Sequence, residues 1–347
     1  MVIRMDKLNM SKYKIRTDLA IESVENISDN YKISEKIVDD IKITEIIIDK
    51  NSEEKLNKKK GRYITIEFND VTDYNNRQKI IKNFSDELKN FIKVYNIKEN
   101  FSCLVIGLGN EKSTPDSLGP NTIDNILVTK HLFDLNGNNV EEGFRCVSAF
   151  NPGVMGVTGI ETSEVIKSLI SAVNPDFIIV VDALAASAIS RVNKTIQMTD
   201  SGIHPGSGVG NHRKELSKDT LGIPVIAIGI PTVVDAVTIV SDTINYMEKH
   251  FSYVKDNIDN PANKLMINDI NYIKKNNLKD LPSDEKKKYM GFLGELSEEE
   301  IKKLVYEVLS PINYNLMVTP KEVDFIIDKL SLILSEGINK SLHKNVE

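Results

Sequence analysis

Several residue types that would indicate a particular chemistry are scarce in this 347-residue sequence, which has two cysteines and five histidines. Cys103 and Cys146 lie in apolar stretches without a CxxC spacing, so we expect reduced core thiols and a reducing cytoplasm. His204 and His212 lie near glycine-rich loops, but neither is spaced from a carboxylate as a pair of helical metal ligands would be. The sequence therefore predicts no cofactor, although it leaves room for a divalent metal.

The sequence also lacks an excess of positive charge and long hydrophobic runs. Its net charge is −6, and acidic and basic residues are interspersed, so it has no basic stripe of the kind that binds a phosphate backbone. The first 22 residues contain scattered charges, and no apolar run approaches the roughly 20 residues of a membrane span. We expect a cytoplasmic protein that binds neither a membrane nor, directly, a nucleic acid.

Short apolar stretches bounded by glycine, proline and aspartate recur through the centre of the chain, as is typical of buried parallel strands. They lie at 103–107, 145–150, 177–181, 195–198 and 225–229. Amphipathic segments of helical length separate them, at about 118–133, 162–173, 183–192 and 232–250. This alternation predicts an α/β fold with three layers, α/β/α, around a mostly parallel central sheet.

The sequence outside this central region is less regular. Residues 1–60 have weak periodicity and predict a loosely packed arm. Residues 252–290 are polar and aperiodic, which indicates an excursion from the core. Two further helices are expected, near 297–309 and 320–336, the second with Thr319-Pro320 as its cap and first turn.

Two aspartates follow predicted strands. Asp116 lies in the loop after 103–107, which is not a dinucleotide fingerprint because Lys112 stands where GxGxxG needs its third glycine. Asp182 comes directly after 177–181. Ligands of open α/β sheets bind beyond the carboxyl ends of the strands, although either acid could instead cap a helix. Two acids on neighbouring strands would share a proton and could act as base on water and as acid on a departing amine.

Two further loops are rich in glycine. The loop over 199–211 could bind a carbonyl oxygen or an extended peptide through its backbone N–H groups, and a flexible surface loop has the same composition. The candidate binding residues in and just after this loop are His204, Gly206, Ser207, Gly208, Gly210 and Arg213. In the loop over 151–162, Thr158 and Glu161 have the spacing of a helix capping box, so we interpret Glu161 as structural.

Taken together, these motifs resemble the spore germination protease family of endospore-forming bacteria. The resemblance covers most of the chain, through 16–20, 107–120, 152–162, 182–186, 195–213, 222–238 and 317–324. It implies a fold similar to the hydrogenase maturation peptidases, and a homotetrameric endopeptidase made as a zymogen. Its implied substrates are the small acid-soluble proteins that coat spore DNA, in the developing spore and spore core. By motif position, the resemblance implies that Asp116 and Asp182 are catalytic.

The family has been classed both as metallopeptidase and as aspartic peptidase. The sequence favours the aspartic type, because zinc normally takes about three protein ligands with histidine or cysteine among them. One departure from the family pattern is Ser187, where an arginine is expected, and it bears on the subsite for acidic substrate residues.

The string Thr17-Asp18-Leu19-Ala20-Ile21-Glu22 resembles the family's substrate site. It predicts a propeptide of residues 1–18, removed by the enzyme itself between Asp18 and Leu19, and a single peptidase domain of 19–347. Two alternatives stay open. A phosphate- or nucleotide-handling enzyme could use the glycine-rich loops, but no GKS or GKT follows either loop. A non-catalytic module could use the acids to bind a basic protein.

Overall fold

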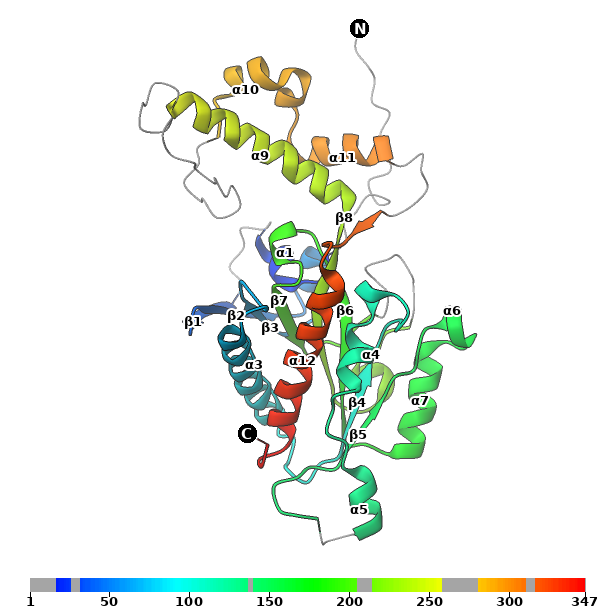
Figure 1. The fold of residues 1–347 in the computed structure, drawn as a ribbon. Coiled ribbons are helices and arrows are strands. Elements are labelled where there is room, and N and C mark those ends of the chain that lie inside the picture. Colours follow the sequence, from blue (N-terminus) through cyan, green and yellow to red (C-terminus); the bar gives the residue numbers. More distant parts are fainter. Residues whose placement is uncertain are drawn as a thin grey trace. The chain divides into compact units, whose positions relative to one another are not determined.

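The computed structural model describes residues 17–25, 32–136, 140–204, 214–257, 280–309 and 316–346 (Figure 1). The chain divides into two compact units. The larger unit contains 16–186, 191–233 and 319–347, and the smaller contains 1–15, 187–190 and 234–318. Both candidate acids belong to the larger unit. The single peptidase domain of 19–347 stays a prediction.

The described strands form one sheet in the order β1-β2-β3-β7-β8-β6-β4-β5, and β9 pairs with β8. Their bounds are β1 Lys32–Val38, β2 Ile41–Ile48, β3 Gly61–Glu67, β4 Cys103–Gly107, β5 Val147–Phe150, β6 Phe177–Ala186, β7 Thr195–Thr199, β8 Val225–Asp235 and β9 Met317–Val318. The strand β4 is parallel to β5 and β6, whereas β1, β2, β3, β7 and β8 pair antiparallel in succession. The predicted α/β class with a central sheet is confirmed. The sheet is mixed, and its parallel part carries the candidate acids.

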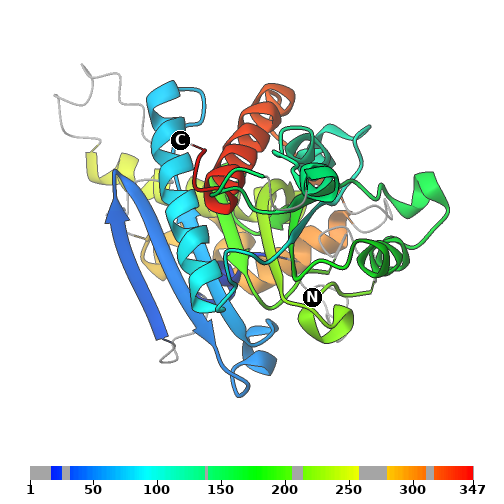
Figure 2. The same ribbon diagram turned by 90° about the horizontal axis from the view of Figure 1, so that it is seen from below.

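Helices cover both faces of this sheet, because the side chains of β4 and β6 alternate between two apolar clusters. Val105 and Ile179 point to the face where α3 and α12 lie side by side (Figure 2). Ile106 and Val180 pack on the other face against α7. The helices are α1 Ala20–Glu25, α2 Glu53–Leu56, α3 Tyr74–Val94, α4 Leu118–Ile123, α5 Lys130–Asn136, α6 Met155–Thr158, α7 Thr162–Val173, α8 Lys218–Leu221, α9 Ala236–Asn257, α10 Ser283–Met290, α11 Glu298–Leu309 and α12 Val323–Leu342.

The sequence assignments are wrong where tertiary contacts override local pattern. The helix expected at 183–192 is instead the continuation of β6 to Ala186, where the Leu184 side chain lies over Gly229 of β8. The helix expected at 118–133 is broken into α4 and α5. Between them, the Thr129 N–H donates to the Val147 carbonyl (2.9 Å) and draws the chain onto β5.

The ends of several elements also differ from expectation. The first 60 residues are not only a loose arm, because β2 buries four of its five isoleucines. The helix α12 begins at Val323 rather than at Thr319-Pro320. Thr158 is the last residue of α6, and Glu161 is the N-cap of α7 without a side-chain hydrogen bond. The prediction that Thr158 and Glu161 form a capping box is therefore wrong. The predicted polar excursion includes the end of α9 and all of α10.

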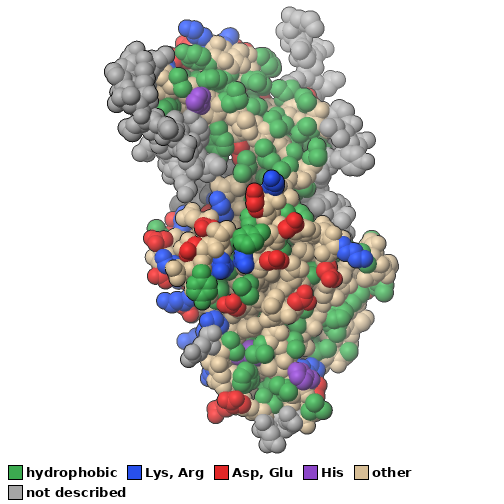
Figure 3. Space-filling model, in the orientation of Figure 1, with side chains coloured by type: hydrophobic (Ala, Val, Ile, Leu, Met, Phe, Trp, Pro, Cys, Tyr) green, Lys and Arg blue, Asp and Glu red, His purple; other side chains and the backbone are tan. Residues whose placement is uncertain are grey.

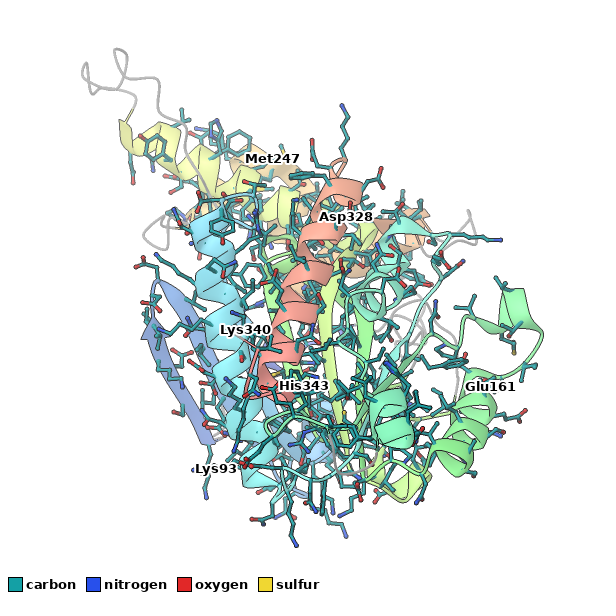
Figure 4. All side chains as sticks on the ribbon, turned by 60° about the horizontal axis from the view of Figure 1, so that its bottom comes forward. Lys93, Glu161, Met247, Asp328, Lys340 and His343 are labelled. Carbon is teal, nitrogen blue, oxygen red and sulfur yellow. The ribbon has the colours of Figure 1, made fainter. Side chains whose placement is uncertain are left out.

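The C-terminal residue of α12 is followed by His343, a buried histidine (Figure 4). Its Nδ1 accepts a hydrogen bond from the Arg145 N–H (3.2 Å), so its Nε2 carries the proton and donates to the Leu127 carbonyl (3.2 Å). Burial lowers the pKa of His343, and the positive charge of Arg145 acts in the same direction.

In the smaller unit, α9 and α11 share a small apolar core of Val237, Ile301 and Val305. Lys286 of α10 pairs with Glu248 of α9 at 2.7 Å. Both cysteines are free thiols, and burial raises the pKa of Cys103. Within the described residues of either unit, no helix combines the length and the apolar character that a membrane crossing requires.

Candidate active site

Asp116 lies in a tight loop that follows β4. The loop turns back on itself, so that the Asn110 N–H donates both to the Asp116 carbonyl (3.0 Å) and to its Oδ2 (2.9 Å). The Asp116 N–H donates to the Ser113 carbonyl (2.7 Å), and Thr114–Asp116 form a short 3₁₀ helix, η2. The carboxylate is thereby oriented by the backbone of its own loop.

This loop depends on two glycines. Gly109 has φ of +122°, and a Cβ built there would lie 2.0 Å from the Asp116 carbonyl oxygen. Gly119, at the start of α4, allows the helix to lie on the strand ends, since its Cβ would meet the Leu108 oxygen at 2.2 Å and the Val181 oxygen at 2.8 Å. The glycines of this motif therefore serve close backbone packing around Asp116.

Asp182 lies inside β6 rather than at its end, contrary to the sequence prediction. Its residue is 6% exposed, and its Oδ1 accepts from the Ala183 N–H (2.9 Å). The parallel strand β4 ends at Gly107, which is paired with Val181. Asp182 is thus the first residue of β6 beyond the end of β4, and the expectation that it lies at the carboxyl edge of the parallel strands is met there.

The structure brings the Asp116 loop to the strand that carries Asp182. The Leu108 N–H donates to the Val181 carbonyl (2.8 Å), immediately before Asp182. On the side of β8, Thr232 Oγ1 donates to the Pro115 carbonyl (2.6 Å), and Thr319 Oγ1 donates to the Thr232 carbonyl (2.9 Å). Sequence reasoning assigned no role to Thr232 and only a helix-cap role to Thr319, although both lie in stretches that carry the family resemblance.

The described residues include the two ends of the second glycine-rich loop. Gly206, Ser207, Gly208, Gly210 and Arg213 lie outside the described residues. The two ends of the loop are held together by reciprocal backbone bonds between Ile203 and Leu216, of 2.9 and 2.8 Å. The His204 side chain is exposed, with Nε2 3.9 Å from Glu215. In the described part of the chain, no three histidine, cysteine, aspartate or glutamate side chains are grouped as metal ligands.

The predicted cleavage segment is docked on the larger unit. Leu19 and Ala20 are 0% exposed. The Asp18 N–H donates to the Ala185 carbonyl (3.0 Å), and the Ala185 N–H donates to Asp18 Oδ2 (2.8 Å). The Gln197 side chain of β7 spans Leu19: its Nε2 donates to the Asp18 carbonyl (3.0 Å), and its Oε1 accepts from the Ala20 N–H (2.6 Å).

Charged side chains surround this segment. Lys58 Nζ donates to the Thr17 carbonyl (2.7 Å), and Arg191 lies 3.5 Å from Glu22. The Thr17 hydroxyl accepts from the Leu19 N–H (3.0 Å) and donates to Glu22. Burial lowers the pKa of Lys58, while the carboxylates of Asp18 and Glu22 oppose that shift. Sequence analysis did not identify Lys58, Arg191 or Gln197, because nothing in their local patterns links them to residues 17–22.

Comparison with known proteins assigns the family. The model of the germination protease family matches residues 9–347. This chain belongs to the germination protease family, and it is an endopeptidase. The germination protease of Bacillus cereus strain B4264 is 47% identical over 356 residues, which cover 99% of this chain and 97% of that protein. The germination protease of Bacillus subtilis strain 168 is 48% identical over 360 residues, with 99% and 97% covered.

A solved structure of a hydrogenase maturation protease from Thermococcus kodakarensis matches 41% of this chain and 80% of that one, with 21% identity and a TM-score of 0.27.

Membership of a protease family across nearly the whole chain rules against the phosphate- or nucleotide-handling alternative.

Proposed function

We propose that this endopeptidase degrades small acid-soluble spore proteins during germination, and that Asp116 and Asp182 activate the attacking water. The observation that carries the proposal is the 2.8 Å bond from the Leu108 N–H to the Val181 carbonyl, which ties the Asp116 loop to β6 directly before Asp182. Two carboxylates on adjoining segments can share one proton, so that one is a base while the other is an acid.

The reaction then needs one proton on the pair. The ionised carboxylate removes a proton from water while the water oxygen bonds to the carbonyl carbon of the substrate. The protonated partner donates a hydrogen bond to the carbonyl oxygen, and a proton passes to the amide nitrogen as the C–N bond breaks. The Asn110 and Ala183 N–H groups orient Asp116 and Asp182 respectively, which keeps both carboxylates in place for these transfers.

The test is substitution of each acid by its amide. We expect Asp116→Asn and Asp182→Asn each to lower cleavage of a small acid-soluble spore protein at least 100-fold, with the circular dichroism spectrum unchanged. Asp176→Asn is the matched control, because Asp176 precedes β6 and binds Ser102 at the opposite end of the strand. It should keep more than half of the activity. More than a tenth of wild-type activity in either active-site variant would contradict the aspartate pair.

We further propose that residues 1–18 are a propeptide that keeps the enzyme inactive. In the docked segment, the Asp18–Leu19 bond lies beside Ala185, three residues past Asp182, which corresponds to about 10 Å along a strand. The bond therefore reaches the aspartate pair only after the segment leaves this position. Docking of the segment thus supports a zymogen that removes its own N-terminus.

N-terminal sequencing tests self-cleavage. The purified full-length chain is exposed to mildly acidic, low-water conditions, in which a close carboxylate pair shares a proton more readily. A new terminus at Leu19 is expected in the wild type, and none in Asp116→Asn. Ragged ends in both proteins would mean that other proteases trim the chain.

An apolar stripe supports the proposed homotetramer. Val240, Met247 and Val254 are spaced by seven residues on α9 and are 40%, 47% and 42% exposed. Met247 is marked in Figure 4, and Figure 3 shows hydrophobic side chains gathered over the unit that contains α9 to α11. Light scattering should report four copies of the 39.0 kDa chain for the wild type and smaller particles for Met247→Lys. A monomeric wild type would contradict the tetramer.

We place the enzyme in the developing spore and spore core.

A further inference from the structure

The loop that carries Asp116 takes its shape from short-range hydrogen bonds and its place on the sheet from long-range ones. The bonds that join Asn110 and Ser113 to Asp116 lie within the loop, so they would survive a movement of the whole loop. At the end of the loop, Thr232 Oγ1 of β8 donates to the Pro115 carbonyl (2.6 Å). This bond fixes the peptide group that leads directly into Asp116, and it comes from the strand on the far side of β6 from β4.

Thr232 occupies a core position that an apolar side chain would fill equally well. It is 1% exposed, and it continues the face of β8 on which Ile228 and Ile230 pack into the larger apolar cluster. Valine has nearly the same shape, and a buried hydroxyl is costly unless it is hydrogen-bonded. The hydroxyl of Thr232 is therefore accounted for by its acceptor, the Pro115 carbonyl.

A second threonine holds the main chain of Thr232. Thr319 Oγ1 donates to the Thr232 carbonyl (2.9 Å). The chain leaves the larger unit one residue after Thr232, passes through 234–318 of the smaller unit, and returns to the larger unit at Thr319. The hydrogen bond thus joins the two connections within the larger unit. Two hydrogen bonds in series, from Thr319 to Thr232 and from Thr232 to Pro115, end beside Asp116.

We propose that Thr232 is a positioning residue that holds the Asp116 carboxylate in the place where it shares a proton with Asp182, and that Thr319 supports Thr232. The inference rests on the aspartate pair proposed above. Thr232 acts through the peptide group of Asp116 and not on the substrate, so loss of its hydroxyl should lower kcat and leave KM nearly unchanged.

The same loss should change the pH dependence of kcat. Two carboxylates that share a proton have widely separated pKa values, because the charge of one opposes ionisation of the other. Carboxylates that lie farther apart interact less, so the two pKa values of the pair move toward each other. The pH range over which the pair holds one proton then narrows from both sides, an effect that a general loss of stability would not produce.

The test removes each hydroxyl while the shape of the side chain is kept. Thr232→Val and Thr319→Val each lose one of the two hydrogen bonds, and Thr232→Ser keeps the donor. Thr129→Val is the matched control, because Thr129 is 2% exposed and its hydroxyl also bonds to main-chain groups. It accepts from the Val147 N–H (2.9 Å) and donates to the Arg145 carbonyl, at the opposite end of the parallel strands from Asp116.

Every protein is first treated with a removable trace of wild-type enzyme, so that differences in self-processing do not enter. The kcat and KM for a small acid-soluble spore protein are then measured across a range of pH, and thermal unfolding is followed by circular dichroism.

We expect Thr232→Val to lower kcat about tenfold or more, with KM within about threefold of wild type and a narrower pH profile. Thr319→Val acts one step farther from Asp116 and should lower kcat about fivefold. Thr232→Ser and Thr129→Val should keep kcat within about threefold of wild type and the wild-type width of the profile. A wild-type kcat in Thr232→Val, or an equal loss in Thr129→Val, overturns the inference. If Thr232→Val does not fold, a wild-type kcat in the partly exposed Thr319→Val overturns it instead.

The variant Asp116→Asn, measured in the same assays, separates this inference from the proposed function. A loss of about 100-fold or more in Asp116→Asn, together with a wild-type kcat in Thr232→Val, overturns the positioning role alone. More than a tenth of wild-type activity in Asp116→Asn overturns the aspartate pair, and with it the group that Thr232 is proposed to position.

Discussion

Replacing Gly109 by alanine tests whether the glycines of the Asp116 loop serve the active site. The new Cβ would lie 2.0 Å from the Asp116 carbonyl oxygen, so one of the two must move by about 1 Å to reach the 3.0 Å at which contacts become tolerable. Forcing a methyl group into a packed site costs about 1–3 kcal/mol, and a left-handed backbone adds about 1–3 kcal/mol. A 1 Å displacement of a catalytic group can lower the rate about 100-fold.

We therefore expect Gly109→Ala to lower kcat/KM about 100-fold while the protein stays folded at 20 °C, with stability reduced by about 2–6 kcal/mol. Peptidase assays and thermal unfolding followed by circular dichroism measure the two effects. Gly222→Ala is the matched control, because Gly222 has φ of +79° and no atom lies within 4 Å of its added Cβ. It should lose stability but keep its activity. Activity of Gly109→Ala within threefold of wild type would refute the reasoning, and so would an equal loss in Gly222→Ala.

Three further predictions concern docking, pH and packing. Gln197→Met removes both side-chain hydrogen bonds to the cleavage segment. It should therefore speed self-cleavage about tenfold, as measured by gel electrophoresis over time. Slower cleavage would mean that Gln197 assists the reaction. Burial lowers the pKa of His343 in the folded protein. The neutral histidine therefore contributes its full stability above about pH 6.5, the pKa of histidine in the unfolded chain. This contribution is lost as the pH falls from there through the lower pKa of the folded protein. Urea unfolding from pH 8 to 5 should show this decline in wild type and less of it in His343→Gln. Gly337→Ala places a Cβ 2.2 Å from the Phe84 ring and should cost about 1–3 kcal/mol, whereas Gly156→Ala, with nothing within 4 Å, should not.

The predictable part of the fold is the part dictated by local pattern. The apolar stretch 103–107 is β4 as expected, and 162–173 is α7 with the expected bounds. Both have a periodicity that one kind of element satisfies. The stretch Ala183–Ala186 has no such pattern, since small apolar residues suit a helix or a strand. It belongs to β6 because Leu184 packs on Gly229 and Ala185 pairs with Asp18, contacts that join distant parts of the sequence.

In the candidate site too, local sequence pattern indicates some residues, and only long-range contacts indicate the others. Asp116 and Asp182 can be proposed as candidates from the sequence because each follows a strand that is recognisable from its own residues. Gln197 and Lys58 could not be predicted, because only their contacts with the segment around Asp18 distinguish them, and Asp18 is 179 and 40 residues away respectively. Gln197 reads in sequence as the polar member of an alternating strand, and Lys58 as one of three consecutive lysines.

The docked segment has two parts with different physical roles, and the predicted cleavage site separates them. Leu19, Ile21 and Val24 are buried, so undocking the segment exposes three apolar side chains at about 1.5–3 kcal/mol each. The docked state therefore predominates, and the self-cleavage proposed above would require a minor population in which the bond can reach Asp182. Thr17 and Asp18 contribute mainly polar contacts. The proposed cut between Asp18 and Leu19 would release the polar contacts of Thr17 and Asp18 and would let α1 return to its place, so the core would keep all of its apolar side chains.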